Sequence, residues 1–184
     1  MPLIVGFERV CGCWLSSPPI EHFGCYESTC VADGKLMQVI EVGLDGMAIA
    51  DLVVIARKGA RIRLSEGSEA RIRKSRELVE RWVAEGRVIY GVTTGFGALS
   101  DVIIPAGDAR LLQRNILMSH AAGVGEALEE EVVRAMMALR IKDLARGHSG
   151  VRLETVCMLV ELLNRGIVPL IPAKGSVGAS GDLA

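Results

Sequence analysis

Five segments with helical periodicity, four of them closed by a glycine, constrain what this chain can fold into. Residues 47–57, 65–85, 108–119, 129–146 and 151–165 carry apolar residues at helical spacing. Gly86, Gly147 and Gly166 directly follow three of these segments, and Gly59 lies two residues after Arg57, the end of the first. Glycine reaches the left-handed conformation that ends a helix without steric cost. The pattern therefore predicts a mainly α-helical fold.

The starts of these segments carry residues that favour helix N-termini. Ser65 or Ser68 can cap the second segment and Asp108 can cap the third. The acidic run that begins at Glu129 suits the positive end of the fourth. Residues 37–42 and 60–64 are short strand candidates. The expected apolar face of the second helix consists of Ile72, Val79 and Val83.

The composition excludes several classes of protein. The chain has 184 residues, about the length of one domain, half of them apolar, and a net charge of -1. It can bury a core and lacks the basic field of a nucleic-acid binder. Aromatic residues make up only 4%, which argues against stacked-base or carbohydrate platforms. Its apolar runs fall short of the roughly 18 residues of a membrane span, so we expect a cytoplasmic protein.

The first 36 residues differ from the rest in composition. Four of the five cysteines lie there in Cys-x-Cys and Cys-x4-Cys spacings that fit zinc sites poorly, so no metal is expected. We interpret residues 1–36 as an unrelated or disordered extension, with Met37 as a candidate true start, and residues 37–184 as the domain proper. The candidate zinc ligands in this stretch are Cys11, Cys13, Cys25, Cys30 and His22.

The glycine-rich C-terminal run holds a sequence that can react with itself. Lys174 precedes the glycines, the reverse of the order in a phosphate-binding loop. In Ala179-Ser180-Gly181, the amide nitrogen of Gly181 can attack the carbonyl carbon of Ala179. Loss of two waters, one from the Ser180 hydroxyl, would leave an electrophilic alkene. The alternative interpretation is a plain turn.

Three segments in order resemble the aromatic amino acid lyases, and their histidine-acting branch in particular. These are Tyr90-Gly-Val-Thr-Thr-Gly-Phe-Gly97, Asn115-Ile-Leu-Met-Ser-His-Ala-Ala-Gly-Val-Gly125 and Gly175-Ser-Val-Gly-Ala-Ser-Gly-Asp-Leu-Ala184. The resemblance covers roughly residues 37–184. It implies that Ala179, Ser180 and Gly181 form 4-methylideneimidazol-5-one, with no external cofactor, and that Asp182 supports this loop.

The resemblance also assigns roles in the first segment. Tyr90 matches the catalytic tyrosine, and a phenol acts as a base only where its surroundings favour the phenolate. Gly91, Gly95 and Gly97 would let the loop move as a lid or approach the ligand closely, with Gly97 beside the substrate. The histidine-acting branch commonly has Asn where this chain has Thr93, and related lyases have Thr.

Ser119 and His120 match the pair that faces the substrate ring in the family. The histidine-acting branch has Ser-His there, the tyrosine-acting branch His-Leu and the phenylalanine-acting branch Phe-Leu. A polar pair can hydrogen-bond an imidazole and would be left unpaired by a phenyl ring. A histidine capping a helix end is the structural alternative, and both interpretations can hold. His148 and Cys157 are expected to be structural.

The resemblance implies an enzyme that deaminates L-histidine without oxidation to give urocanate and ammonia. It further implies a homotetramer in which each active site takes residues from three subunits. We expect this chain to be the N-terminal portion of such an enzyme, truncated after the Ala-Ser-Gly sequence, with exposed apolar helix faces and no activity alone. Two alternatives remain: a non-catalytic truncated or split-gene product, and a tyrosine or phenylalanine ammonia-lyase or aminomutase.

Overall fold

The first half of the fold is a short parallel sheet with a helix between its strands. The structure is a computed structural model that describes residues 31–32, 35–36, 38–44 and 46–175. In it, strand β3 (Val39–Val42) pairs with β4 (Arg61–Leu64). Helix α2 (Ile49–Lys58) connects them and ends at Gly59, whose φ is +68°. The strands and the helix predicted from the sequence here are confirmed.

A small hairpin precedes this unit. Strands β1 (Val31–Ala32) and β2 (Lys35–Leu36) pair antiparallel, within the segment that we interpreted as an extension. Residues 1–30, which include the candidate zinc-binding cysteines, lie outside the described residues. The proposed boundary between residues 36 and 37 stays a prediction.

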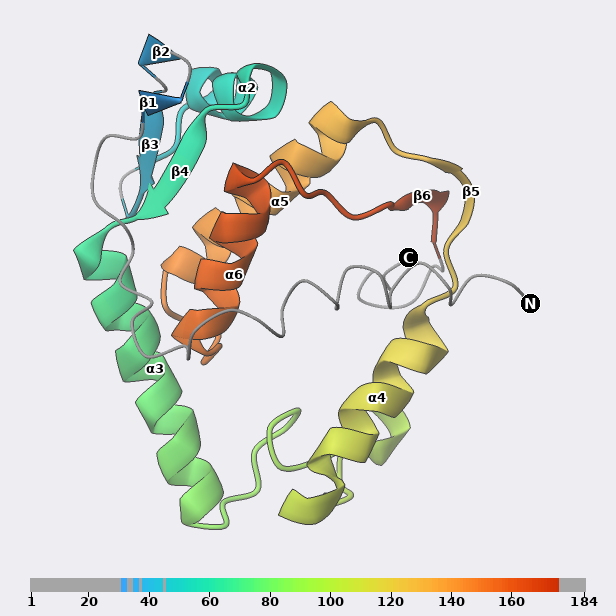
Figure 1. The fold of residues 1–184 in the computed structure, drawn as a ribbon. Coiled ribbons are helices and arrows are strands. Elements are labelled where there is room, and N and C mark those ends of the chain that lie inside the picture. The colour runs from blue at the N-terminus through green and yellow to red at the C-terminus, as the bar shows by residue number, and fades with distance from the viewer. Residues whose placement is uncertain (1–30, 33–34, 37, 45, 176–184) are drawn as a thin grey trace, which may run out of the picture.

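Helix α3 (Glu66–Ala84) begins as the sequence indicates. Ser65 is the N-cap, and its Oγ accepts a hydrogen bond from the amide of Ser68 at 3.2 Å. Ile72 is fully buried, as expected, whereas Val83 is 45% exposed. Figure 1 shows the C-terminal end of α3 extending beyond α5 and α6, whereas Val79, earlier in the same half of α3, lies close to Gly150 in the turn between those two helices.

Helices α5 (Glu130–Ala145) and α6 (Leu153–Asn164) pack side by side at the centre of the fold (Figure 1). Helix α2 and β4 contact this pair at one end, and α3 lies along one side. The main core side chains come from all of these elements. They are Ile40, Val42, Ile55, Ile62, Leu64, Ile72, Val133, Met137, Ile141, Leu144, Val156, Val160 and Leu163.

A buried arginine joins two helix ends inside this core. Arg134 of α5 is 7% exposed, and its Nε and Nη2 donate to the carbonyl of Ile55 at 3.2 and 3.1 Å. Its Nη1 donates to the carbonyl of Leu163 at 3.4 Å. Both carbonyls lie near helix C-termini, where carbonyls lack partners within the helix and a positive charge is favourable. Arg134 therefore ties α2 and α6 to α5.

An asparagine side chain connects α6 to the sheet. The Nδ2 of Asn164 donates to the carbonyl of Ile62 at 2.9 Å, and its Oδ1 accepts from the amide of Ile62 at 2.8 Å. Asn164 ends α6, so the amide group of its side chain binds both backbone groups of a buried strand residue.

We expect Asn164→Ala to lower the free energy of unfolding by about 2 kcal/mol, because two hydrogen bonds disappear and two backbone groups of Ile62 lose their partner. Urea denaturation followed by circular dichroism measures the change. Asn115→Ala is the matched control, since Asn115 is exposed on another helix. Equal effects of the two changes would contradict the prediction.

Helix α4 (Ala109–His120) lies apart from the central helices in Figure 1. The turn η2 (Ala106–Asp108) precedes it, and Leu111, Leu117 and Met118 are 56%, 72% and 68% exposed. This confirms the expected exposure of apolar helix faces. The capping prediction for Asp108 is wrong in one respect. Asp108 occupies the N-cap but its side chain makes no capping bond, because its backbone already follows the preceding turn at φ −94° and ψ −8°.

The mainly α-helical prediction is confirmed, and two pairs of strands were not predicted, the β1–β2 pair described above and a second pair after α4. Strand β5 (Val124–Ala127) follows α4 and pairs antiparallel with β6 (Pro172–Lys174), which follows α6. Gly147 and Gly166 end α5 and α6 with φ values of +73° and +69°. Cys157 packs against the core and His148 is exposed. No helix in the described ranges is both long and apolar enough to cross a membrane.

Candidate active site

Tyr90 lies in the loop between α3 and α4, six residues after Ala84 ends α3, and it begins a turn. Its side chain is exposed, and its phenol oxygen accepts a 3.5 Å hydrogen bond from the amide of Gly97. The ring meets Phe96 edge to face, with centroids 6.1 Å apart and an interplanar angle of 76°. The loop thus closes on itself and presents the phenol to solvent.

The glycines of this loop have specific backbone requirements. Gly91 and Gly97 adopt φ values of +69° and +57°, which side-chain-bearing residues rarely adopt. A Cβ on Gly95 would lie 2.7 Å from the Cβ of Leu99 and 2.8 Å from its carbonyl oxygen. These glycines therefore allow tight turns and close packing inside the loop. Their proposed part in lid motion or close approach to the ligand stays a prediction.

Ser119 and His120 form the last turn of α4. The Ser119 hydroxyl donates to the carbonyl of Ile116 at 3.0 Å, and the Nδ1 of His120 lies 2.9 Å from the same carbonyl. The Ser119 Oγ is also 2.9 Å from this Nδ1. Nδ1 donates to this carbonyl in one tautomer of the ring and accepts from the Ser119 hydroxyl in the other. In the first of these tautomers, the Nε2 of the exposed ring is an acceptor.

This geometry combines the two interpretations of His120. Its Nδ1 binds a carbonyl of the last helical turn, which is the expected structural role at a helix end. In the tautomer with the hydrogen on Nδ1, Nε2 remains available for a ligand that offers an N–H or O–H group. The residue can thus be a helix cap and a binding group at once.

The residues of the predicted electrophile lie outside the described part of the chain. These are Ala179, Ser180 and Gly181, with Asp182 after them. Strand β6 ends five residues before Ala179, and it pairs with β5, which begins four residues after His120. The pairing of Val124 with Lys174 brings the segment that follows His120 to the segment that leads to the Ala-Ser-Gly sequence.

Tyr90 and His120 come from different segments of the chain. The loop that carries Tyr90 precedes the N-terminus of α4, and His120 lies at its C-terminus (Figure 1). A helix of 12 residues spans about 18 Å at 1.5 Å per residue. Across the ranges that the structure describes, no recorded hydrogen bond or ring contact joins the two residues.

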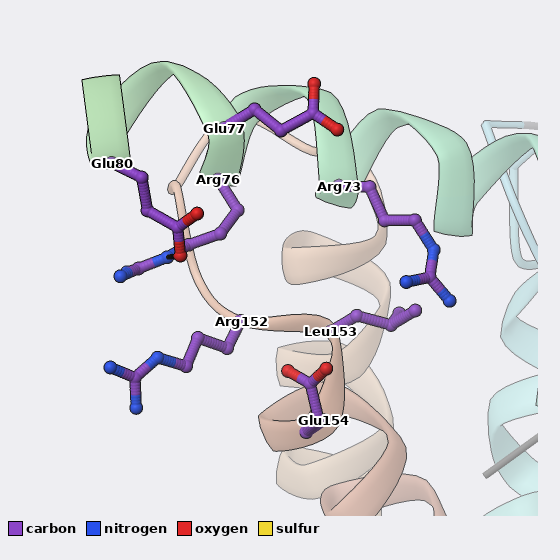
Figure 2. A pocket seen from close by; sticks show the side chains of 7 residues that line it. All are labelled: Arg73, Arg76, Glu77, Glu80, Arg152, Leu153 and Glu154. Atoms are coloured by element: carbon purple, nitrogen blue, oxygen red, sulfur yellow. Dashed lines mark hydrogen bonds and ion pairs between the residues drawn. The ribbon is translucent and has the colours of Figure 1, made fainter. Parts of the chain in front are cut away.

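A cavity elsewhere on the surface holds none of the predicted site residues. It has a volume of about 390 Å³ and lies between α3 and the start of α6, as Figure 2 shows. Its lining includes three arginines and three glutamates, so the charges compensate one another. Within the described ranges, no group of three His, Cys, Asp or Glu residues is arranged to hold a metal ion.

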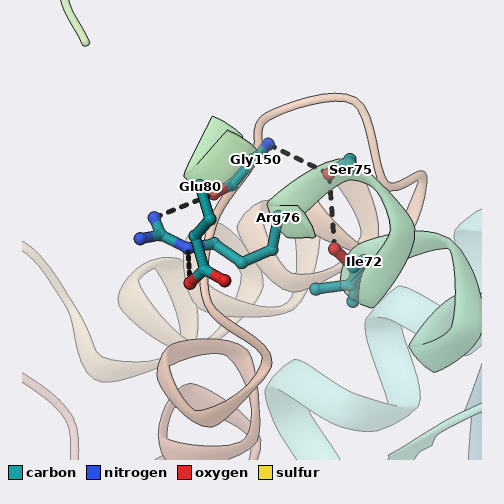
Figure 3. A network of polar contacts seen from close by, with 5 residues as sticks. All are labelled: Ile72, Ser75, Arg76, Glu80 and Gly150. Atoms are coloured by element: carbon teal, nitrogen blue, oxygen red, sulfur yellow. Dashed lines mark hydrogen bonds and ion pairs between the residues drawn. The ribbon is translucent and has the colours of Figure 1, made fainter. Parts of the chain in front are cut away.

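Two of the charged side chains of this cavity already serve the packing of the fold. Arg76 donates to Glu80 at 2.8 Å and to the carbonyl of Gly150 at 3.4 Å (Figure 3). The amide of Gly150 donates to the Ser75 hydroxyl at 3.2 Å, and this hydroxyl donates to the carbonyl of Ile72. The network fixes the turn between α5 and α6 on α3.

Sequence reasoning missed two kinds of contact at the candidate site. One is the carbonyl of Ile116, which orients His120. The other is a set of threonine hydrogen bonds around Tyr90, made by Thr93 and Thr94. Threonine next to glycine in a loop is a signal for side-chain bonds to the local backbone, and it could have indicated the second kind.

The helical fold, and the order in which the three site segments follow one another along the sequence, define the class of this protein. The chain belongs to the aromatic amino acid lyase family, whose model matches residues 47–184. A curated relative from Caldanaerobacter subterraneus subsp. tengcongensis, named histidine ammonia-lyase, is 53% identical over 148 residues. The match covers 80% of this chain and 29% of the relative, so the chain spans less than a third of that relative's length.

Solved structures of the family share this fold. Histidine ammonia-lyase from Trypanosoma cruzi matches with a TM-score of 0.67 and 39% identity, over 76% of this chain and 27% of that one. Tyrosine aminomutase from Streptomyces globisporus matches with a TM-score of 0.71 and 36% identity, over 74% of this chain and 26% of that one. The fold is therefore common to family members named for different substrates.

Proposed function

We propose that this chain is part of a histidine ammonia-lyase, which converts L-histidine to urocanate and ammonia. The observation that carries the proposal is the exposed His120, whose Nδ1 lies 2.9 Å from the carbonyl of Ile116, so that the tautomer with the hydrogen on Nδ1 offers Nε2 as an acceptor. An imidazole N–H of the substrate can donate to this nitrogen, and a phenyl ring cannot. The identity of 53% with a relative named histidine ammonia-lyase supports the same choice.

The chain carries the residues that the family's electrophile requires. Ala179, Ser180 and Gly181 supply every atom of 4-methylideneimidazol-5-one, and the β5·β6 pairing joins the segment leading to them to the segment after His120. When formed, such a group supplies an electrophile, which eases the loss of ammonia, a poor leaving group. Asp182 would support the loop that holds it.

The other residues have separate tasks in this proposal. Tyr90 takes the β-proton of the substrate through its phenol oxygen, which the amide of Gly97 orients by a 3.5 Å hydrogen bond. His120 binds the imidazole, and Ser119 holds the same Ile116 carbonyl and so keeps the last turn of α4 in place. Gly97 also lines the substrate position.

A homotetramer and a cytoplasmic location belong to the proposal. The family resemblance implies an active site shared among subunits, and the exposed apolar residues of α4 offer a surface on which other copies can pack. The location rests on the sequence pattern described above.

A chimaera tests the proposed activity directly. The matching 148 residues of this chain replace the corresponding part of the Caldanaerobacter relative. We expect the chimaera to produce urocanate from L-histidine, measured by the growth of its ultraviolet absorbance, and this chain alone to produce none. A folded tetrameric chimaera that turns over no amino acid would favour the alternative of a non-catalytic product.

The second candidate is a tyrosine or phenylalanine ammonia-lyase or aminomutase, and the similarity to a tyrosine aminomutase structure favours it. His120→Leu in the chimaera separates the two. We expect the kcat/KM for L-histidine to fall about 10- to 150-fold, because the imidazole N–H of the bound substrate loses its acceptor at a cost of about 1–3 kcal/mol. Turnover of L-tyrosine is measured in parallel.

The control for this change is Met118→Leu, since Met118 is a neighbouring exposed residue of the same helix. It should leave both rates unchanged. A wild-type chimaera that prefers L-tyrosine, or an undiminished rate with L-histidine after His120→Leu, would refute the role given to His120.

A further inference from the structure

Thr93 holds the backbone that leads into Tyr90. Its Oγ1 accepts a hydrogen bond from the amide of Ile89 at 2.8 Å and donates to the carbonyl of Arg87 at 2.7 Å. One hydroxyl therefore uses both its donor and its acceptor capacity on residues just before Tyr90. Replacing it by a methyl group of the same size would remove both bonds.

Thr94 holds the backbone that leaves Tyr90. It is 2% exposed, and its Oγ1 accepts from the amide of Gly91 at 3.2 Å and donates to the carbonyl of Gly95 at 3.0 Å. The residues on both sides of Tyr90 are thus fixed by side-chain hydroxyls.

The same loop closes through its own backbone. The amide of Gly95 donates to the carbonyl of Val102 at 3.0 Å, and the amide of Ile104 donates to the carbonyl of Thr93 at 2.9 Å. Thr94 and Ile103 form an antiparallel bridge between these bonds. The orientation of Tyr90 is therefore set inside residues 87–104.

We propose that Thr93 is a positioning residue that fixes the Tyr90 ring against Phe96 and the Gly97 amide before any substrate binds. The chemical use of this position rests on the proposed function, whereas the positioning itself is a property of the loop. Thr93 is the informative choice because it is only half-buried, so its replacement disturbs the packing less than a change at Thr94.

Nuclear magnetic resonance of this chain tests the positioning without turnover. Thr93→Val keeps the side-chain shape and removes the hydroxyl, Thr93→Ser keeps the hydroxyl, and Thr93→Asn supplies a different donor and acceptor. Thr155→Val is the matched control, since Thr155 is exposed on α6. The readouts are the hydrogen-exchange rate of the Ile89 amide and the cross-relaxation between the Tyr90 and Phe96 rings.

With Thr93→Val we expect the Ile89 amide to exchange about tenfold faster, the effect of losing a hydrogen bond worth about 1.4 kcal/mol. The cross-relaxation between the two rings should weaken in the same variant. Thr93→Ser and Thr93→Asn should restore both values, and Thr155→Val should change neither. Unchanged ring cross-relaxation in Thr93→Val, or no rescue by serine, would overturn the proposal.

The chimaera adds a catalytic readout. Thr93→Val should lower kcat by about 10- to 100-fold with little change in KM, because a misplaced base affects the chemical step more than substrate binding. If the chimaera forms urocanate but the contact between the Tyr90 and Phe96 rings is the same with and without the Thr93 hydroxyl, the positioning role is wrong. If the ring contact depends on Thr93 but no urocanate forms, the positioning stands and the proposed function fails.

Discussion

Replacing Tyr90 with phenylalanine in the chimaera is expected to lower kcat for L-histidine about 10²- to 10⁴-fold, the usual contribution of a positioned acid or base. The substitution removes only the phenol oxygen, which is the atom that the Gly97 amide binds. The edge-to-face contact with Phe96 is made by the ring and survives the change. The fold of the loop should therefore persist while proton abstraction is lost.

Single-turnover and steady-state rates with L-histidine measure this effect. KM should change little, since the proposal assigns binding of the substrate ring to His120 and not to Tyr90. Phe96→Leu is an informative companion variant. It keeps the phenol but removes the ring contact, so a smaller loss is expected. A rate within threefold of wild type for Tyr90→Phe would show that another group takes the proton.

The largest expected loss of stability comes from Gly147→Ala. Gly147 ends α5 with φ at +73°, and a Cβ there would lie 2.6 Å from the Cβ of Arg71 and 2.8 and 2.9 Å from its carbonyl carbon and oxygen. The left-handed conformation costs about 1 kcal/mol or more for alanine, and the clash adds about 1–3 kcal/mol. We therefore expect the free energy of unfolding to fall by about 3 kcal/mol.

The matched control is Gly166→Ala. Gly166 ends α6 with φ at +69°, and a Cβ there would meet nothing within 4 Å. It reports the conformational cost alone, about 1 kcal/mol. Urea denaturation of the two variants separates that cost from the close approach of α3 and α5. Equal losses would show that the backbone of α3 moves away without penalty.

The elements predicted best are those specified by local residues. Ser65 caps α3, and Gly59, Gly86, Gly147 and Gly166 adopt positive φ at helix ends, because each requirement involves only a few neighbouring residues. The β5·β6 pair could not be predicted in this way. Its strands are short and exposed, and 44 residues separate Ala127 from Pro172, so their pairing depends on where α5 and α6 return the chain.

The candidate site shows the same division. Tyr90, Ser119 and His120 could be chosen from the sequence because their residue types and motifs are distinctive. The hydrogen bond of His120 to Ile116 could not, because a carbonyl is present at every residue and only the helical turn selects one.

The hydrogen bonds of Asn164 have a consequence for how copies of this chain can associate. The amide of Arg61 donates to the carbonyl of Gln38 beside β3, so both backbone groups of the next residue, Ile62, face the opposite edge of β4. An unpaired strand edge is a template on which a strand of another molecule can add. Here the side chain of Asn164 occupies that template at the middle of β4. The parallel sheet is thereby protected against edge-to-edge aggregation, even though the exposed apolar helix faces favour contact between copies.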